Sequence, residues 1–481
     1  MTERKRCLRS VLGGAIVLPL VLVLTGCNGW SMFGFGATHS AFSSAETVIG
    51  TGNVGSLFES GTTAPTSGPI SSSPTIAKNV LYVTSQGVGG ASPGTLSAYA
   101  ADGSTNCSTA TPRTCTPLWT ATPARSHGLS STPAVDTAQG VVYVGSANGE
   151  LYAYDAGGNS GCATGTNGAK VCNPLWHSDL LGGSIDSSPA LADGYVYIST
   201  VYGAMYMFPE TTGYDHKNPS CASNRDGLVC HWEWADRTPG DVLSSPAVSN
   251  GRVYTASTGS QGLGRLWAFD ATTDNSPNCT GTRFIDKTCS PQWTAARNSG
   301  KSSPVVVNGV VYIGSLLDGL LAFAADGSAN CSGTQYAGRT CSPLWTGTTD
   351  RQEESTPAVA DGVVYIGARN GDLYAFNATN GTPQWTASTA GPIDSSPAFA
   401  NGVVYVGCSN ELSTCPGNLY AFNATNGSPL WTGTTSATDG SIDTSPIVAD
   451  VAPIASDVAS TSSAGAVYVG SGNRTYGFAL F

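Results

Sequence analysis

The sequence predicts an all-β protein, an eight-bladed β-propeller of four-stranded antiparallel blades. Short apolar runs alternate with turns rich in Gly, Asn, Asp and Thr, and Gly alone supplies 60 of the 481 residues. A unit of four such runs recurs eight times along the chain. A stretch near the start of the chain matches the one run that the last unit lacks. The chain is therefore expected to close into a ring.

The first element is an export signal that precedes the fold. Basic residues gather in the first nine positions, and an apolar run over residues 11–24 follows. A membrane-spanning helix needs about 20 apolar residues, so this shorter run is typical of a signal peptide. It ends in Leu24-Thr25-Gly26-Cys27, which resembles the lipobox of bacterial lipoproteins. The resemblance implies a lipoprotein signal peptide over residues 1–26 and a lipid on the Cys27 thiol. An ordinary secretory peptide with an incidental Cys27 is the alternative.

The charge balance excludes a nucleic-acid-binding surface. The chain has 21 basic and 32 acidic residues, and cleavage before Cys27 removes four basic residues and one acidic residue. The remaining 17 and 31 give a net charge of −14. Such a surface does not bind anionic lipid headgroups, so the acyl chains would supply the attachment. We expect a bacterial extracytoplasmic protein, at the cell surface or in the periplasm, in which residues 27–56 follow the lipid anchor.

Residues 355–387 show the repeated unit without insertions. A Ser/Thr-Pro anchor is followed by Val-Val-Tyr-Ile-Gly, then Asp-Leu-Tyr-Ala-Phe-Asn, and the unit closes on Trp385. Asp-Gly and Asn-Gly turns separate these runs and favour tight antiparallel hairpins. The anchor proline recurs at Pro74, Pro133, Pro189, Pro246, Pro304, Pro357, Pro397 and Pro446. The shortest spacing is 40 residues, a typical propeller period.

Closing tryptophans are one fewer than the anchors, so one blade lacks its last strand. They are Trp119, Trp176, Trp234, Trp293, Trp345, Trp385 and Trp431. Residues 57–63 align with residues 344–349 of the repeat and place Phe58 where the tryptophan stands. We predict a propeller over residues 57–481, in which residues 57–63 complete the last blade beside residues 475–478. An open solenoid of hairpins is the alternative.

Twelve cysteines remain once Cys7 and Cys27 are set aside, and they form six close pairs. The pairs are Cys107/Cys115, Cys162/Cys172, Cys221/Cys230, Cys279/Cys289, Cys331/Cys341 and Cys408/Cys415. Paired cysteines in an exported chain predict disulfides. Five pairs fall between the third and fourth strands of a unit, and the sixth falls between the second and third. These insertions are expected to enlarge one face of the ring.

A metal site at the Cys221/Cys230 pair is the alternative, because His231 follows the pair and His216 is nearby. Four other pairs at the same repeat position have no such histidines, so no metal site is predicted.

The repeats resemble the quinoprotein-like (pyrroloquinoline quinone repeat) propellers, whose units read Ser-Pro, Val-Tyr-Val-Gly, Gly-x-Leu-Tyr-Ala-Phe-Asp and Gly-x-x-x-Trp. Trp30-Ser31-Met32-Phe33-Gly34 is also similar to the N-terminal motif of that family. The family includes pyrroloquinoline-quinone-dependent dehydrogenases, the propeller lipoprotein of the outer-membrane barrel-assembly machine, and surface proteins. The resemblance implies the fold and an inter-blade packing role for the closing tryptophans, but it does not choose among these functions.

A quinone site would need residues that this chain largely lacks. The dehydrogenases that it resembles commonly use a disulfide between adjacent cysteines, a tryptophan floor, a Glu/Asn/Asp calcium set and an aspartate base. No Cys-Cys dipeptide occurs here, and Trp267, which could be a floor, stands where the repeat has a packing tyrosine. We expect no catalytic residue and no cofactor. An alcohol or sugar dehydrogenase with pyrroloquinoline quinone and calcium is the alternative.

Four acidic residues could surround one mouth of the channel. Asp186, Glu354, Asp394 and Asp443 each stand three residues before an anchor proline. They could bind a cation or a basic ligand if the anchor strand is innermost. Capping of the local turns is the alternative that we favour. The sequence therefore predicts a lipid-anchored binding or scaffolding module for a protein or glycan partner, with no nucleic acid. An outer-membrane assembly factor differs from this only in its partner.

Overall fold

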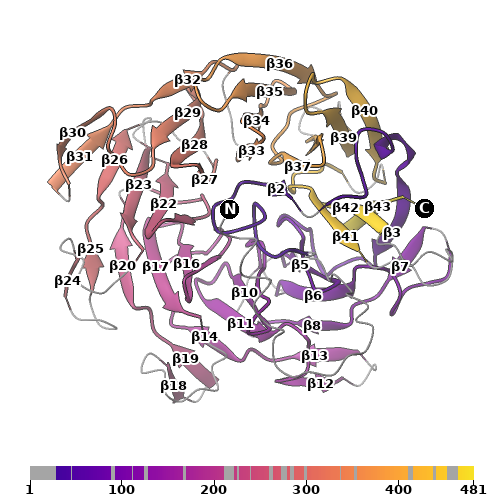
Figure 1. Ribbon diagram of the computed structural model, residues 1–481. Coiled ribbons are helices and arrows are strands. Elements are labelled where there is room, and N and C mark those ends of the chain that lie inside the picture. Colours follow the sequence, from indigo (N-terminus) through magenta and orange to yellow (C-terminus); the bar gives the residue numbers. More distant parts are fainter. Residues whose placement is uncertain are drawn as a thin grey trace, which may run out of the picture.

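The chain forms a ring of eight antiparallel sheets in a computed structural model, which confirms the predicted eight-bladed β-propeller (Figure 1). The structure describes residues 29–480 except 45, 88–92, 111, 124–127, 166–168, 211–220, 225–226, 239, 259–263, 272–278, 282–286, 297–300, 336, 351–354, 410–414, 416, 437–439 and 452–463. The predicted signal peptide, Cys27 and Glu354 lie outside the described residues. In the described part of the chain, no helix is long and apolar enough to cross a membrane.

Each blade is a meander that runs outward from the channel. The innermost strands are β4 (Thr75–Ala77), β9 (Ala134–Asp136), β15 (Ala190–Ala192), β21 (Ala247–Ser249), β27 (Val305–Val307), β33 (Ala358–Ala360), β37 (Ala398–Ala400) and β41 (Ile447–Val451). The second strands are β5 (Val80–Ser85), β10 (Val141–Gly145), β16 (Tyr195–Ser199), β22 (Arg252–Ser257), β28 (Val310–Ser315), β34 (Val363–Gly367), β38 (Val403–Gly407) and β42 (Ala464–Ser471).

The third and outer strands complete each blade. The third strands are β6 (Thr95–Ala100), β11 (Leu151–Asp155), β17 (Ala204–Pro209), β23 (Arg265–Asp270), β29 (Gly319–Ala324), β35 (Asp372–Asn377), β39 (Asn418–Asn423) and β43 (Arg474–Ala479). The outer strands are β8 (Trp119–Ala121), β14 (Trp176–Ser178), β20 (Trp234–Arg237), β26 (Trp293–Ala296), β32 (Trp345–Gly347), β36 (Pro383–Ser388), β40 (Pro429–Thr434) and β3 (Phe58–Thr63). We number the blades 1 to 8 in this order.

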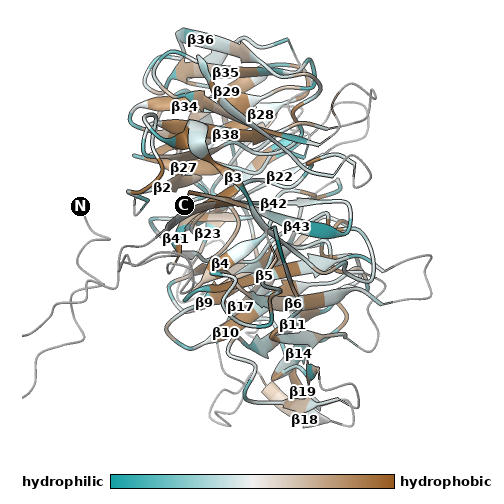
Figure 2. Cartoon of the chain, turned by 90° about the vertical axis from the view of Figure 1, so that its right-hand side faces the viewer, coloured by the Kyte–Doolittle hydropathy of each residue, from teal (hydrophilic) through white to brown (hydrophobic). Residues whose placement is uncertain are grey.

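The second strands form the core between blades because both of their faces are covered. All five residues of β10 and of β38 are buried, and the side view shows apolar residues stacked on strands such as β27 and β34 (Figure 2). Each blade also bonds to the next. In blade 4, the Tyr254 hydroxyl and the Trp293 Nε1 both donate to the Ala325 carbonyl of blade 5, at 2.9 and 3.1 Å. The same pair of bonds occurs in blades 1, 5 and 6, and in blade 7 the Trp431 Nε1 donates to the Leu57 carbonyl just before β3 of blade 8, so these closing tryptophans have the predicted inter-blade role.

The ring closes through the N-terminal strand, as predicted. β3 pairs antiparallel with β43, and Thr62 lies opposite Tyr476. At the same joint, the Tyr468 hydroxyl of blade 8 donates to the Ala101 carbonyl of blade 1 at 2.6 Å. Blade 8 is thus built from both ends of the propeller sequence, and no open solenoid end remains at this joint.

The predicted register of that closing strand is wrong. In blade 6, Trp385 lies opposite Ala375, and the equivalent third-strand residue of blade 8 is Gly477. The residue opposite Gly477 is Gly61, whereas Phe58 lies opposite Ala479. Gly61 therefore occupies the tryptophan position.

Gly61 is closely covered by a neighbouring strand. β7 (Arg113–Cys115) pairs with β3 at Gly61, and a Cβ atom on Gly61 would lie 3.1 Å from the Arg113 carbonyl oxygen. A larger residue at position 61 would therefore require β7 to shift by a few tenths of an ångström.

All six predicted disulfides are formed, and five of them close insertions that extend the sheets. Cys162 lies opposite Cys172 across β12 (Cys162–Thr164) and β13 (Lys170–Cys172), for example. This hairpin of blade 2 does not stand on a face of the ring. Instead β13 adds in parallel to β8, the outer strand of blade 1. The expectation that the insertions enlarge one face is therefore wrong for these five: they widen the circumference (Figure 1).

The same arrangement recurs in four more blades. The other added strands are β7, β18 (Cys221–Asn224) with β19 (Gly227–Cys230), β24 (Cys279–Thr280) with β25 (Thr288–Cys289), and β30 (Cys331–Thr334) with β31 (Ala337–Cys341).

The sixth disulfide, Cys408–Cys415, is built differently from the others. Cys408 follows β38 directly and Cys415 stands shortly before β39, so the bond joins the two ends of a connection within blade 7. Their Cα atoms are 6.2 Å apart, whereas those of the other five pairs are 3.9–4.0 Å apart. Both cysteines are fully buried. Residues 410–414 of the connection lie outside the described residues, so the expectation that this insertion enlarges a face stays a prediction.

Candidate functional site in the central channel

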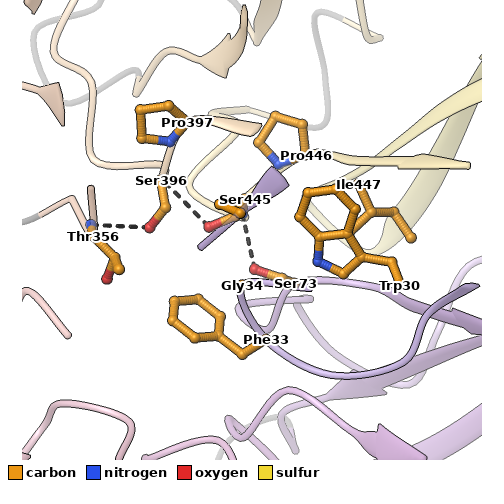
Figure 3. Close-up of a pocket in the computed structure, with 11 residues that line it drawn as sticks. Trp30, Phe33, Gly34, Ser73, Thr356, Ser396, Pro397, Ser445, Pro446 and Ile447 are labelled. Carbon is orange, nitrogen blue, oxygen red and sulfur yellow. Dashed lines mark hydrogen bonds between the residues drawn. The ribbon is translucent and has the colours of Figure 1, made fainter. Parts of the chain in front are cut away.

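The anchor serines and threonines form a closed ring of hydrogen bonds around the channel. In each blade the residue before the anchor proline donates its backbone N–H to the hydroxyl of the corresponding residue in the next blade. The order is Ser73, Thr132, Ser188, Ser245, Ser303, Thr356, Ser396, Ser445 and back to Ser73, with distances of 2.9–3.2 Å. Figure 3 shows the part of the ring from Thr356 to Ser73. These hydroxyls are structural, as the sequence predicts.

The residue before each of these has a different task, because it holds the strands of its own blade together. The Ser395 hydroxyl accepts the Gly407 N–H at 2.8 Å and donates to the Gly407 carbonyl at 3.0 Å. Equivalent paired bonds join Ser355 to Gly367 and Thr444 to Gly470. The two hydroxyls of each anchor thus explain why the motif needs both: the first binds within the blade and the second binds between blades.

The N-terminal segment, residues 29–43, lies across the inner strands and occupies the middle of the ring (Figure 1). β1 (Gly29–Trp30) pairs with β4, and β2 (Phe42–Ser43) pairs with β37. Between them, carbonyls of the segment accept N–H bonds of 2.7–2.9 Å from blades 2, 4, 5 and 6: Ser31 from Val135, Ala37 from Val248, Thr38 from Val306 and Ser40 from Val359. The segment therefore satisfies inner-strand amides that would otherwise face the channel. Sequence reasoning placed this segment outside the ring.

A small pocket, with room for about one water molecule and partly open to solvent, lies between this segment and the anchor ring (Figure 3). Trp30 and Phe33 line it on one side, and Ser396, Pro397 and Pro446 line it on the other. No charged side chain is among its lining residues.

The histidine of the N-terminal segment is also neutral. His39 is fully buried, and its Nδ1 lies 3.1 Å from the Pro304 carbonyl. Burial lowers the pKa of His39 to about 4, so the ring carries no charge at neutral pH. Nδ1 then holds the proton that it donates to the carbonyl.

Three of the four predicted channel-mouth carboxylates are described, and each of these three has a partner. The Ser184 hydroxyl donates to Asp186 at 2.6 Å, and the Ser441 hydroxyl donates to Asp443 at 2.7 Å. The Asp394 carboxylate lies 3.9 Å from the Nε of Arg369.

These contacts join each carboxylate to one neighbouring side chain, and the choice between turn capping and a shared site stays a prediction. Among the described residues, no three His, Cys, Asp or Glu side chains come together as a metal site.

A pair of carboxyl groups, buried Glu46 and half-buried Asp450, was missed from the sequence, and it lies where the N-terminal part of the chain meets blade 8. Glu46 is only 4% exposed, and its Oε1 accepts the N–H groups of Val48 and Ile49, both at 2.7 Å. Burial, and then a hydrogen bond with Asp450, raise the pKa of Glu46 to about 8. Glu46 is therefore protonated at neutral pH and can donate to Asp450. No periodic signal marks it, because it lies outside the repeats.

A second missed cluster lies in blade 2. The Glu150 carboxylate accepts bonds from Tyr152 and Asn148, and His177 lies 3.5 Å away. Burial alone would raise the pKa of Glu150, but the bonds from His177, Tyr152 and Asn148 outweigh it and lower the pKa to about 2.

A sequence signal for this cluster existed. Asn148-Gly149-Glu150 matches the Asn-Gly-Asp turn of blade 6, and His177 stands where Thr follows Trp385.

Trp267 as a cofactor floor and Cys230 with His231 as metal ligands were the alternatives that the sequence left open, and both sets of residues make other contacts in the structure. Trp267 is 8% exposed, stacks on Phe269 with ring centroids 6.4 Å apart, and donates to the Ser257 hydroxyl. Tyr374 stacks in the same way in blade 6, so Trp267 is a blade residue and not a floor. Cys230 is in a disulfide, and His231 pairs with Asp179; His216 lies outside the described residues.

The family described as outer membrane protein assembly factor BamB matches residues 61–231, 173–340 and 292–478, which together cover most of the propeller. The chain belongs to this family. The matches overlap because neighbouring blades are alike. A comparison with curated proteins finds no match.

Solved structures with this fold include members of the BamB family and quinone enzymes. BamB from Moraxella catarrhalis is 14% identical with a TM-score of 0.52, over 88% of this chain and all of that one. The quinohemoprotein alcohol dehydrogenase from Comamonas testosteroni is 12% identical with a TM-score of 0.60, over 94% and 80%. A europium-containing methanol dehydrogenase is 12% identical with a TM-score of 0.58, over 95% and 99%. At these identities the likeness shows the fold alone.

The described channel does not fit a quinone cofactor with its metal. Pyrroloquinoline quinone carries three carboxylates, and calcium needs six to eight oxygen ligands. The cavity offers hydroxyls already used in the ring, prolines and aromatic rings, and Trp30 and Phe33 of the N-terminal segment fill part of the space. The acidic groups at the mouth bond locally instead of converging. We derive no reaction step through this cofactor.

Proposed function

We propose that this member of the BamB family is a lipid-anchored extracytoplasmic propeller that binds and positions a partner protein at a membrane. The observation that carries the proposal is the N-terminal segment in the channel. It occupies the place where a propeller would hold a small ligand, so the surfaces left for a partner are the outer ones. Rigid blades that display short loops and edges suit this role. A glycan partner is the second possibility.

The short tether supports an orientation on the membrane. Only Asn28 lies between Cys27 and Gly29, and two residues span at most about 7 Å. Gly29 is level with Ala77 at the end of an inner strand, beside the exposed Lys78. A lipid on Cys27 would hold this turn side of the ring against the bilayer. The opposite side, where exposed Asp443 precedes β41, would face away from it.

The experiment places a photo-crosslinking residue at position 78 or position 443 of the full chain in bacterial membranes. We expect lipid adducts from position 78 and protein adducts from position 443 or the circumference. Cys27→Ser is the matched control, and it should lose fatty-acid labelling and the lipid adducts. Adducts to purified envelope glycan alone would contradict a protein partner.

A second assay addresses the enzyme alternative. The purified protein is mixed with pyrroloquinoline quinone and calcium, desalted, and examined for the absorbance of retained quinone. We expect none to be retained, and stoichiometric retention with dye-linked alcohol oxidation would overturn the proposal.

A further inference from the structure

Three neighbouring blades have outer edges that no disulfide hairpin of the described chain covers. In blades 8, 1, 2, 3 and 4 such a hairpin strand adds in parallel to the outer strand: β7 on β3, β13 on β8, β19 on β14, β25 on β20 and β31 on β26. No described residue pairs in this way with β32, β36 or β40 of blades 5 to 7. In Figure 1, β32 and β36 lie at the circumference with no strand outside them, whereas η2 (Val54–Ser56) of the N-terminal part of the chain passes beside β40. We call their outer edges the open rim.

The added strands follow one chemical rule. The hairpin residue that lies opposite the position after the closing tryptophan is always β-branched: Thr114, Val171, Val229, Thr288 and Thr340. In four of the five hairpins a Lys or Arg precedes it. At blade 3, the N–H of Ala235, the residue after Trp234, points outward and donates to the Lys287 carbonyl at 3.1 Å. An outward N–H at this position is thus the docking point for an added strand.

The open rim has the same docking point in every blade. The position after the closing tryptophan is Thr346 in blade 5, Thr386 in blade 6 and Thr432 in blade 7. Thr386 lies opposite Tyr374 in the register that Ala235 has with Tyr206. The Thr386 N–H therefore also points outward, away from β35.

The exposed fraction of the closing tryptophan also differs between blades with and without an added hairpin strand. Where a hairpin covers the outer strand of blades 1 to 4, the closing tryptophan is at most 2% exposed, as for Trp119 and Trp234. Trp345, Trp385 and Trp431 on the open rim are only partly buried. The missing hairpins thus leave both unpaired backbone and aromatic surface on three consecutive blades.

The open rim lacks the charges that protect many edge strands, although β36 and β40 each begin with a proline and a bulge. Natural edge strands usually carry charges that prevent the addition of another strand. β36 reads Pro-Gln-Trp-Thr-Ala-Ser and β40 reads Pro-Leu-Trp-Thr-Gly-Thr, and neither contains a charge. Each has a bulge next to its first proline, and the following residues pair regularly with the third strand. Four residues from the tryptophan onward are long enough for one added strand.

We propose that the open rim binds an extended segment of a partner protein, which adds in parallel to β36 or β40 as the chain's own hairpins do elsewhere. The segment would place a β-branched residue, preceded by Lys or Arg, opposite Thr386 or Thr432. Main-chain hydrogen bonds would hold it, and its side chains would cover Trp385 or Trp431. This inference rests on the proposed function as a protein-binding module and names the surface and the kind of segment that is bound.

The test uses the full mature chain and a synthetic, disulfide-closed peptide of residues 329–343, labelled with a fluorophore. This peptide contains the hairpin that blade 5 lays on blade 4. Fluorescence anisotropy should show saturable binding, and the double variant Thr386→Pro with Thr432→Pro should weaken it at least tenfold, because proline removes both outward N–H groups. The double variant Thr386→Val with Thr432→Val keeps these groups and should stay within twofold of the natural protein.

Hydrogen exchange gives a second measurement that does not depend on the folding of the proline variant. Peptide binding to the unchanged chain should protect the amides of residues 383–388 and 429–434. Absence of saturable binding, protection elsewhere, or equal loss with valine and proline would overturn the proposal. If the membrane crosslinks described above persist unchanged in the proline variant, the scaffold function stands and the open rim is not its binding surface.

Discussion

Removing the Ser73 hydroxyl should weaken the joint that closes the ring. Ser73 accepts the Ser445 N–H at 2.9 Å, which is the hydrogen bond between blades 8 and 1 in the anchor ring. Ser73→Ala leaves that amide without its acceptor in a site where Ser73 is only 7% exposed. An unsatisfied buried amide costs about 1–3 kcal/mol, and each 1.4 kcal/mol is about tenfold in an equilibrium constant. We therefore expect the Ser445 amide to exchange with solvent roughly ten times faster or more.

Two matched variants make this measurement decisive. Ser73→Thr keeps the hydroxyl and should behave like the natural chain, because Thr132 and Thr356 already occupy this place in other blades. Ser396→Ala removes an equivalent bond between blades 6 and 7, within the continuous part of the chain. The two alanine variants should lower the urea midpoint by similar amounts. If Ser396→Ala destabilises the protein while Ser73→Ala has no effect, the two ends do not close the ring as described.

Two further predictions concern packing and pH. A Cβ atom on Gly407 would lie 2.3 Å from Cγ2 of Ile442, so Gly407→Ala should cost about 1–3 kcal/mol in urea unfolding. Ile442→Ala removes the nearest of these atoms but keeps the Ile442 Cβ and carbonyl oxygen, both at 2.7 Å. The double variant should therefore recover only part of the Gly407→Ala loss, and fully additive losses would contradict the Cγ2 contact. The pKa of Glu46 is raised to about 8 in the fold, above its ordinary value, so its stabilising effect is complete below about pH 4.5 and is lost as the pH rises through 8. Hydrogen exchange over residues 29–50 should accelerate across that range, and Glu46→Gln, which can still bond to Asp450, should remove the dependence; an unchanged pH profile in Glu46→Gln would contradict the assignment.

The architecture could be predicted because most blades make the same contacts within and between blades with the same types of residue. An anchor hydroxyl such as Ser396 must meet the next blade, a glycine such as Gly407 must admit the isoleucine of the following linker, and a tryptophan such as Trp293 must reach the neighbouring carbonyl. A residue that is needed in every blade appears at the same place in every repeat. Periodicity therefore carries the number of blades and the closure of the ring.

The N-terminal segment could not be predicted because it has no repeat to be compared with. Its carbonyls bond to several different blades, and each of these bonds joins residues far apart in the chain. Glu46 has the same difficulty, since its partner Asp450 is remote and only burial makes the pair significant. The register of the closing strand failed for a related reason. Similarity of composition favours Phe58 in the tryptophan place, but the pairing of β3 with β43 places Gly61 there and includes a bulge between Glu59 and Gly61 that the composition does not reveal.

The cysteine spacing predicts each bond but not the place that the bond takes in the fold. Cys408 and Cys415 are separated by seven positions and Cys107 and Cys115 by eight, yet the first pair is buried within a blade while β7, which ends at Cys115, lies outside the neighbouring blade. What distinguishes them is the strand connection that each pair interrupts. Cys408 and Cys415 stand between β38 and β39, two neighbouring strands of one blade, whereas Cys115 ends a strand that pairs with the next blade.

The position of the disulfide hairpins depends on a contact between blades that the cysteines do not encode. The spacing of Cys162 and Cys172 determines a hairpin, and either a face or the circumference could receive it. The circumference is chosen because an outer strand such as β8 presents unpaired backbone groups and a tryptophan face at its edge, and a parallel strand satisfies both. The same physical requirement exists in blades 5 to 7, where the described chain provides no such hairpin. An edge that is covered five times from within the chain is, by the same chemistry, able to accept a strand from outside it.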